Sequence, residues 1–262
     1  MSQKLYQVDA FAENVFSGNP AAVCPLKEWL PDEVMQKIAM ENNLAETAFY
    51  VKTGNQYELR WFTPAVEVDL CGHATLAAAF VLFNHENHNE DAIQFFSHKS
   101  GILTVTKKGD LLTLNFPSDT IKEIAITEDI RRGFDKEPRQ ALKGKTDYLL
   151  LFEKEADIVS VKPNFSEIKK MEARGVIITA KGDAVDFVSR FFGPQVGIDE
   201  DPVTGSAHTT LIPYWAEQLQ KIELSAIQLS ARRGYLTCRH LGDRVEISGK
   251  GKLYLIGEIF IK

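Results

Sequence analysis

The stretch Ser97–Val105 reads S-H-K-S-G-I-L-T-V, and it aligns with Ser230–Cys238, S-A-R-R-G-Y-L-T-C, at an offset of 133 residues (from 97 to 230). The same offset relates further segments: Gly109-Asp110 to Gly242-Asp243, and Gly72-His73-Ala74 to Gly205-Ser206-Ala207. Collinear matches at one offset are typical of an internal duplication. The alternative is a coincidental recurrence of β-hairpin turn residues. We predict two related halves.

The halves differ by a short insertion. Arg60–Pro64 resembles Arg190–Pro194 at an offset of 130 (from 60 to 190), so the second half carries three extra residues before Gly205. Strand-end and turn residues at 116–119 place the junction near residues 117–125. We therefore predict domains at 1–118 and 119–262, with the last strand, near 253–262, as a segment that can return to the first half.

Each half shows the same order of elements: a short strand, a loop ending in glycine, an apolar helix and three strands. The predicted helices span residues 73–83 and 206–220, the second interrupted by Pro213, and a third, amphipathic helix spans 32–41. The predicted strands span residues 59–62, 92–96, 101–107, 111–116, 187–192, 226–229, 234–239 and 244–248. The predicted fold class is α+β, with two pseudo-repeated halves, each a mostly antiparallel sheet wrapped around a central helix.

Composition narrows the class of protein. The chain has 262 residues, 44% hydrophobic and 25% charged, which is typical of a globular enzyme-sized protein. A net charge of -6 argues against a nucleic-acid or anionic-membrane partner. The cysteines Cys24, Cys71 and Cys238 show no C-x-x-C spacing, so we expect neither disulfides nor zinc, and a cytoplasmic location. Neither a signal-peptide core nor an apolar run of membrane-spanning length is evident.

Two glycine loops, at Gly72 and Gly205, each open a predicted helix. Helix N-termini present unpaired N–H groups, so two such ends facing each other would bind a carboxylate or phosphate through backbone alone, without Arg or metal. The alternative is that both glycines only make tight turns. Polar residues stand around these loops: His73, Asp199, Glu200, Asp201, Thr204, Ser206 and His208. Their ordinary roles would be a solvent-exposed His73, a turn-forming Asp201 and a helix-capping Ser206.

Glu46 is the remaining candidate. In a strand it shares a face with Leu44, Ala48 and Tyr50, an apolar setting that favours the protonated carboxyl. A carboxyl poised between its two forms can take and return a proton. The alternative is an edge-strand charge that faces water.

Five motifs in order resemble the phenazine-biosynthesis isomerase (PhzF-like) family over essentially the whole chain. They are Phe16–Val23, Leu44–Phe49, Arg60–Pro64, Cys71–Thr75 and Glu200–Ala207. The resemblance implies a fold similar to that of diaminopimelate epimerase, an active site between the halves, a homodimer and no cofactor. It also implies a reaction in which a glutamate moves a proton between carbons of a small carboxylated substrate.

Carried over by position, Glu46 matches the catalytic acid/base of that family, and His73, Asp201 and Ser206 match residues that line the site. We take His73 and Asp201 as the further catalytic candidates. Gly72 and Gly205 match the helix-opening glycines, and together with Ser206 they are the candidates for binding the substrate or its anionic group. Ala45 departs from the family, in which many members have Ser before the glutamate. The epimerase relatives use two opposed cysteines, but here Cys71 is matched by Thr204, so two-thiol racemisation is disfavoured.

Other readings stay open or are set aside. No phosphate-loop or dinucleotide fingerprint is present, and His85-Glu86-Asn87-His88 resembles a metal pair only superficially, so we expect no metal. The expected function is a cofactor-independent isomerase. The alternatives are an idle ligand- or protein-binding member of the same fold, or an amino-acid racemase or epimerase, because a fold transfers its site more safely than its reaction.

Overall fold

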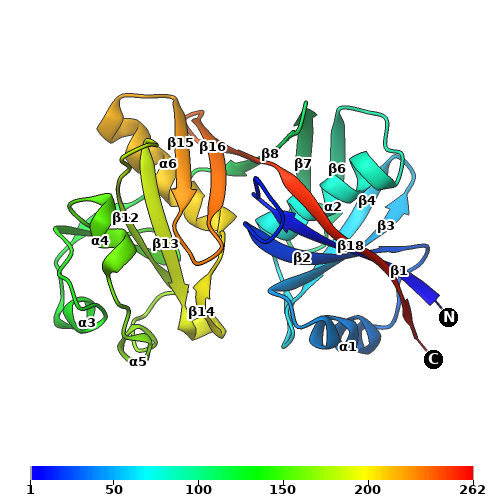
Figure 1. Cartoon of the computed structure of the whole chain (residues 1–262), viewed down its shortest axis with the longest axis horizontal. Coiled ribbons are helices and arrows are strands. Elements are labelled where there is room, and N and C mark those ends of the chain that lie inside the picture. The colour runs from blue at the N-terminus through cyan, green and yellow to red at the C-terminus, as the bar shows by residue number, and fades with distance from the viewer. Residues whose placement is uncertain (1, 262) are drawn as a thin grey trace. The chain divides into compact units, whose positions relative to one another are not determined.

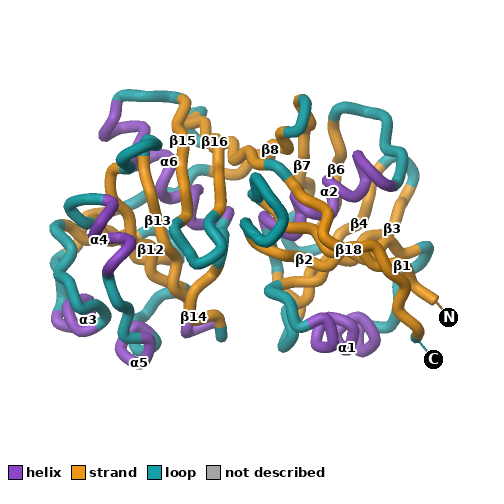
Figure 2. Tube along the Cα trace, viewed as in Figure 1, coloured by secondary structure: helices purple, strands orange, loops and turns teal. Residues whose placement is uncertain are grey.

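The computed structural model describes residues 2–261. The chain forms two compact units: unit 1 contains the residues up to Asn115 and those from Ser248 onward, and unit 2 contains Phe116–Ile247. Figure 1 labels the elements of both, and Figure 2 shows that each contains more strand than helix. The C-terminal strand is thus part of the first unit.

Unit 1 is a mixed sheet with two helices. Its strands are β1 (Ser2–Ala10), β2 (Asn19–Leu26), β3 (Glu46–Thr53), β4 (Gln56–Phe62), β5 (Glu67–Val68), β6 (Ala92–Ser97), β7 (Gly101–Lys108), β8 (Leu111–Pro117) and β18 (Gly251–Phe260). Its helices are α1 (Asp32–Asn42) and α2 (Gly72–His85). β1 pairs antiparallel with both β18 and β2, β2 runs parallel to β3, β3 pairs antiparallel with β4, and β4 runs parallel to β6.

Unit 2 repeats this plan with more helices. Its strands are β9 (Lys122–Ile124), β10 (Gln140–Lys143), β11 (Asp147–Leu151), β12 (Gly175–Lys181), β13 (Phe187–Gly193), β14 (Ile198–Asp201), β15 (Glu223–Gln228), β16 (Gly234–His240) and β17 (Arg244–Gly249). Its helices are α3 (Glu128–Arg132), α4 (Glu155–Ser160), α5 (Phe165–Ile168), the 3₁₀ turn η1 (Pro194–Val196) and α6 (Gly205–Leu219).

The strand pairings of the two units correspond one to one. The antiparallel pair β1–β2 corresponds to β10–β11, the parallel pair β2–β3 to β11–β12, and the antiparallel pair β3–β4 to β12–β13. The parallel pair β4–β6 corresponds to β13–β15. This topology confirms the predicted α+β class and its internal repeat.

The repeat extends to side chains. In unit 1 the Arg60 guanidinium donates to both oxygens of Glu67 at 2.7 and 2.9 Å, and in unit 2 Arg190 does the same with Glu200 at 2.7 and 2.9 Å. The arginines lie 130 residues apart and the glutamates 133 apart (60 to 190, 67 to 200). The three extra residues of unit 2 therefore lie between Arg190 and Glu200, the segment that contains η1.

Each unit buries its central helix against the sheet. α2 packs on β1, β2, β3 and β18, and α6 on β11, β15 and β16 (Figure 1). Gly251 allows the close approach of α2, because a Cβ there would lie 2.5 Å from the Phe80 ring. α1 covers a second apolar layer in unit 1, and α3, α4 and α5 cover one in unit 2. Burial of each large apolar side chain contributes about 1.5–3 kcal/mol.

The predicted interruption at Pro213 is wrong, since α6 continues through it from Gly205 to Leu219. Leu211, Ile212 and Trp215 are buried around the proline. Their packing offsets the backbone hydrogen bond that proline cannot donate. None of the helices within residues 2–261 has the length and apolar composition that a membrane crossing requires.

Gly101 and Gly234 are equivalent in the repeat, since each opens a strand, but they should tolerate substitution differently. Gly101 has φ +72° with open space around its Cβ position, whereas a Cβ on Gly234 would lie 2.1 Å from Val203 Cγ2. Gly101→Ala should lower the free energy of unfolding by about 1–2 kcal/mol, with Gly101→Asn milder, because Asn tolerates the left-handed region. Gly234→Ala should cost about 1–3 kcal/mol, with Gly234→Asn worse, because the obstacle there is space. Urea unfolding of the four variants checks this; the same order of Ala and Asn at both positions would contradict it.

Candidate functional site

Glu46 opens β3 in the interior of the unit 1 sheet. It pairs with Ala21 of β2 on one side, and its neighbour Thr47 pairs with Phe62 of β4 on the other. Its exposed fraction is 9%. The alternative of an edge-strand carboxylate facing water is therefore wrong, and a charge so placed needs a partner.

His73 is that partner. As the second residue of α2 it is 4% exposed, so the alternative of a solvent-exposed histidine is also wrong. Its Nε2 lies 3.0 Å from Glu46 Oε2, and its Nδ1 lies 3.1 Å from Asn19 Nδ2. The expectation of purely apolar surroundings for Glu46 is corrected by this contact.

Asn19 can serve both protonation states of the imidazole. In the neutral ring, Nδ1 accepts from the Asn19 amide N–H, and the proton on Nε2 faces Glu46. In the charged ring both nitrogens donate, and a turn of the Asn19 amide presents its oxygen instead. His73 is thus held in place whether or not it carries the additional proton.

Charge and burial act in opposite directions on His73. Burial of the imidazole lowers its pKa, but the Cys71 sulfur and the Glu46 carboxylate outweigh burial and raise the pKa well above the usual value of 6.5. Burial raises the pKa of the Cys71 thiol to about 11, and the Glu46 charge adds to this. The Cys71 sulfur and the Glu46 carboxylate thus both favour the charged imidazole.

The same three side chains could contact one cation. Glu46, Cys71 and His73 each offer a ligand atom, and these atoms lie within 4.8 Å of one another. A metal would first have to displace the thiol proton and compete with the His73–Glu46 contact. The chemistry of the three groups therefore suits proton transfer better than metal binding.

Asp201 ends β14 in unit 2 and is also buried. Its carboxylate accepts from the Thr204 hydroxyl at 2.5 Å. The buried Gln228 amide donates to the Asp201 carbonyl at 2.7 Å and accepts from the Thr204 N–H at 2.9 Å. The loop before α6 is thereby held rigid, beyond the simple turn that Asp201-Pro202 suggests.

Ser206 is the second residue of α6, directly after Gly205. Its Oγ accepts from Arg174 Nη1 at 2.8 Å, and because the N-cap residue of α6 is Thr204, the helix-capping alternative for Ser206 is wrong. Arg174 is fixed in turn by a bidentate pair with the buried Asp147.

The remaining candidates have other roles. Glu200 pairs with Arg190 in the framework, and Asp199 is exposed. His208 is fully buried, its Nδ1 lies 2.9 Å from the Thr204 carbonyl, and burial lowers its pKa to about 4. A histidine that stays neutral at this depth does not shuttle protons near neutral pH.

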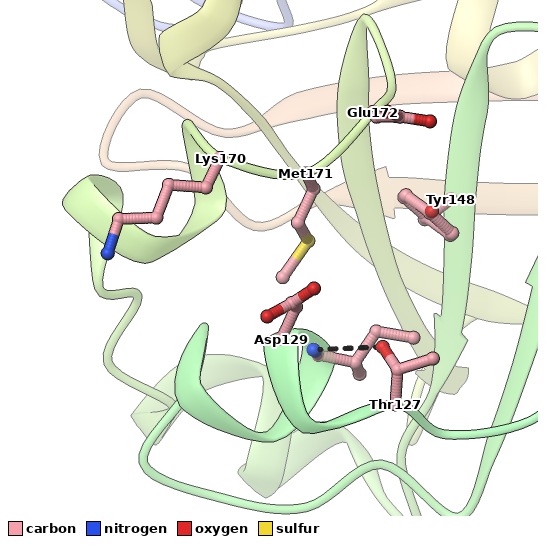
Figure 3. A pocket seen from close by; sticks show the side chains of 7 residues that line it. Thr127, Asp129, Tyr148, Lys170, Met171 and Glu172 are labelled. Atoms are coloured by element: carbon pink, nitrogen blue, oxygen red, sulfur yellow. Dashed lines mark hydrogen bonds between the residues drawn. The ribbon is translucent and has the colours of Figure 1, made fainter.

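A separate hollow of about 260 Å³ lies in unit 2, away from the predicted residues. Figure 3 shows it between α3 and the segment after α5. Its lining residues are Thr127, Asp129, Ile130, Tyr148, Lys170, Met171 and Glu172. Thr127 caps α3 and Lys170 pairs with Glu167, so these polar groups serve surface structure.

The structure therefore brings Glu46, Gly72 and His73 together in unit 1, and Asp201, Gly205 and Ser206 around the start of α6 in unit 2. That the two helix starts face each other stays a prediction. Sequence reasoning missed residues that lack a chemical motif. They are Asn19, Asp147, Arg174 and Gln228. Of these four residues, only Asn19 lies within one of the family motifs, Phe16–Val23. Its neighbours there, Gly18 and Pro20, indicate a turn and give no sign of a contact with a histidine.

Comparisons with known proteins agree on one family. The sequence model described as "Phenazine biosynthesis-like protein" (PhzC-PhzF) matches residues 8–256. An uncharacterized isomerase of Pseudomonas aeruginosa is 49% identical over 261 residues, covering 100% of both chains. The crystal structure of a PhzF-family phenazine biosynthesis protein from Enterococcus faecalis has a TM-score of 0.97 at 50% identity, with 100% of both chains covered. A hydroxyproline epimerase from Agrobacterium vitis shares the fold alone, with a TM-score of 0.65 at 11% identity, covering 98% of this chain and 92% of that one.

The two buried histidines should titrate in opposite directions. His73 should remain protonated above pH 6.5, and its contribution to stability, complete below pH 6.5, should be lost as the pH rises through its raised folded-state pKa. His208 should stay neutral down to about pH 4. The ring C–H signals of both histidines in an NMR titration check this. Glu46→Gln should lower the pKa of His73 and leave that of His208 unchanged. A His73 that titrates at or below 6.5 in the unaltered protein would contradict the ion pair.

Proposed function

Because the chain belongs to the phenazine biosynthesis-like (PhzC-PhzF) family, we propose that it is a cofactor-independent isomerase in which Glu46 moves a proton on a small carboxylated substrate. One observation carries the proposal: the buried Glu46 carboxyl lies 3.0 Å from the buried His73 imidazole at the start of α2. A general acid/base has to be held in place and able to exist in both protonation states.

The proton route follows from this pair. The Glu46 carboxylate takes a proton from a substrate carbon, and the electrons of that C–H bond move into a shifted double bond. The π electrons of the original double bond then form a C–H bond at a different carbon with the proton of the new Glu46 O–H, whose electrons return to the carboxylate. The enzyme ends as it began, and no oxidant is needed. His73 orients the carboxylate throughout and stabilises its ionised form.

Residues of unit 2 are proposed to bind the substrate. The hydrogen-bonded loop from Asp201 to Thr204 leads into the start of α6. There Gly205 and Ser206 supply backbone N–H groups, and Ser206 also supplies a hydroxyl. Positive ends of helices favour carboxylates. Asp201 would position a polar group of the substrate.

Racemisation by two opposed thiols finds less support. Cys71 and Thr204 are the N-cap residues of α2 and α6, so they are equivalent in the repeat. The Thr204 hydroxyl is bonded to Asp201, and a hydroxyl is a far weaker base than a thiolate. A substrate carbon would therefore lack a thiol base from unit 2.

A homodimer and a cytoplasmic location remain proposals. Exposed apolar side chains on β18 support a partner surface: Tyr254, Leu255, Ile256 and Phe260. Because isolated exposed apolar residues are common, sedimentation of the purified protein decides the oligomeric state.

The proposed reaction is tested by hydrogen exchange with solvent. The protein is incubated in D₂O with a panel of unsaturated carboxylic acids that includes a dihydro-hydroxyanthranilate, and deuterium on carbon is measured by mass spectrometry. Glu46→Gln keeps shape and hydrogen bonding but loses the transferable proton, so exchange and turnover should fall at least about a hundredfold while binding persists.

The exposed Glu223 provides a matched control, and Glu223→Gln should leave exchange unchanged. Near-normal exchange by Glu46→Gln would sink the mechanism. If the unaltered protein introduces deuterium into no acid of the panel, the result contradicts the proposed reaction and supports the alternative of a catalytically idle ligand-binding protein.

A further inference from the structure

The strands and the helix that carry the Glu46 site in unit 1 have counterparts in unit 2, and these carry a different set of polar residues. Asn19 opens β2 and Asp147 opens β11, the equivalent strand, although by register the counterpart of Asp147 is Ala21. His73 and Ser206 are the second residues of the equivalent helices α2 and α6. Asn19 contacts His73 directly, and Asp147 is linked to Ser206 through one side chain, that of Arg174.

Arg174 lies one residue before the position that corresponds to Glu46 in the repeat. Phe49 pairs with Arg60 in unit 1 as Ile178 pairs with Arg190 in unit 2, so Gly175 is the counterpart of Glu46. Glu46 opens β3, and Arg174 directly precedes β12, the equivalent strand. Glu46 reaches the helix residue His73 at 3.0 Å, and Arg174 reaches the helix residue Ser206 at 2.8 Å. Beside the start of β12, unit 2 thus carries a side chain that is always charged, whereas unit 1 carries the Glu46 carboxyl at the start of β3.

The guanidinium of Arg174 is held in one orientation. Its Nε donates to one oxygen of Asp147 at 2.9 Å, and its Nη2 donates to the other. Asp147 is 1% exposed, so its charge requires a partner. The Phe191 ring lies 5.3 Å from the guanidinium carbon. Little side-chain entropy is left to lose when a ligand binds.

Donors remain after these contacts. Asp147 and Ser206 engage three of the five guanidinium N–H groups, and the Arg174 side chain is 35% exposed. The Ser206 oxygen accepts from Arg174, which leaves its own hydroxyl proton to donate. Two guanidinium N–H groups and one O–H match the acceptors of a carboxylate.

We propose that Arg174, oriented by Asp147, binds the carboxylate of the substrate together with Ser206. This adds a cation to the backbone N–H groups that the sequence predicts, and it rests on the proposed function. Asp147 is a positioning residue, because it acts through Arg174.

The test uses a double variant, Arg174→Gln with Asp147→Asn. It removes both charges, so no uncompensated carboxylate is left buried and the fold should persist, as circular dichroism and thermal unfolding verify. The matched control is Arg131→Gln with Glu137→Gln, which removes an exposed arginine–carboxylate pair of the same unit.

Binding of benzoate and of its neutral isostere benzamide is measured by calorimetry. The unaltered protein should bind benzoate at least about tenfold more tightly than benzamide. The Arg174/Asp147 double variant should lose that preference, and the control should keep it. Arg174→Lys retains the positive charge but lacks the planar pair of guanidinium donors, so it should weaken benzoate binding severalfold. This single variant tests the proposal if the double variant is unstable.

Two results would overturn the proposal: an unaltered protein that does not prefer benzoate, or altered proteins that bind it as tightly as before. The second result would mean that Arg174 serves only to neutralise Asp147. Glu46→Gln should retain benzoate binding, so failure of the proposed proton transfer and failure of this carboxylate site give separable outcomes.

Discussion

The contact between Glu46 and His73 is the interaction on which the proposed chemistry depends. An ionised carboxylate in the middle of a sheet is costly, and it persists only where a partner stands at bonding distance. The parallel pairing of β2 with β3 places Glu46, and the start of α2 places His73 opposite it. The apolar packing of α2 fixes that helix start, so the core of unit 1 also determines the geometry of the ion pair.

Comparison of the two repeated units distinguishes residues that maintain the fold from residues that differ between the candidate sites. The bidentate pairs Arg60–Glu67 and Arg190–Glu200 recur with the same distances, which indicates a structural role common to both units. The residues at the helix starts differ instead: His73 in one unit and Ser206 in the other. One frame thus carries the Glu46–His73 pair in unit 1 and, in the proposed function, polar groups that bind the substrate in unit 2.

Much of this frame could be predicted from the sequence, because glycines and apolar runs repeat at a fixed offset. The α+β class and the glycine-opened helices followed directly. The interruption predicted at Pro213 was wrong, because local helix propensity takes no account of the buried side chains that stabilise α6 around the proline. The prediction of the surroundings of Glu46 was incomplete for a related reason. Strand periodicity identifies only the neighbours of Glu46 on its own strand, whereas His73 contacts Glu46 from a helix 27 residues further along the chain (46 to 73).

Residues whose role exists only through tertiary pairing were beyond sequence reasoning. Arg174 and Asp147 belong to no motif, and their bond joins segments 27 residues apart. The most direct measurement of the central claim is a crystal structure of Glu46→Gln with the acid that the unaltered protein converts. The proton-transfer mechanism predicts a substrate carbon within about 3–3.5 Å of the residue 46 side chain. A bound substrate whose carbons lie nowhere near that side chain would contradict it.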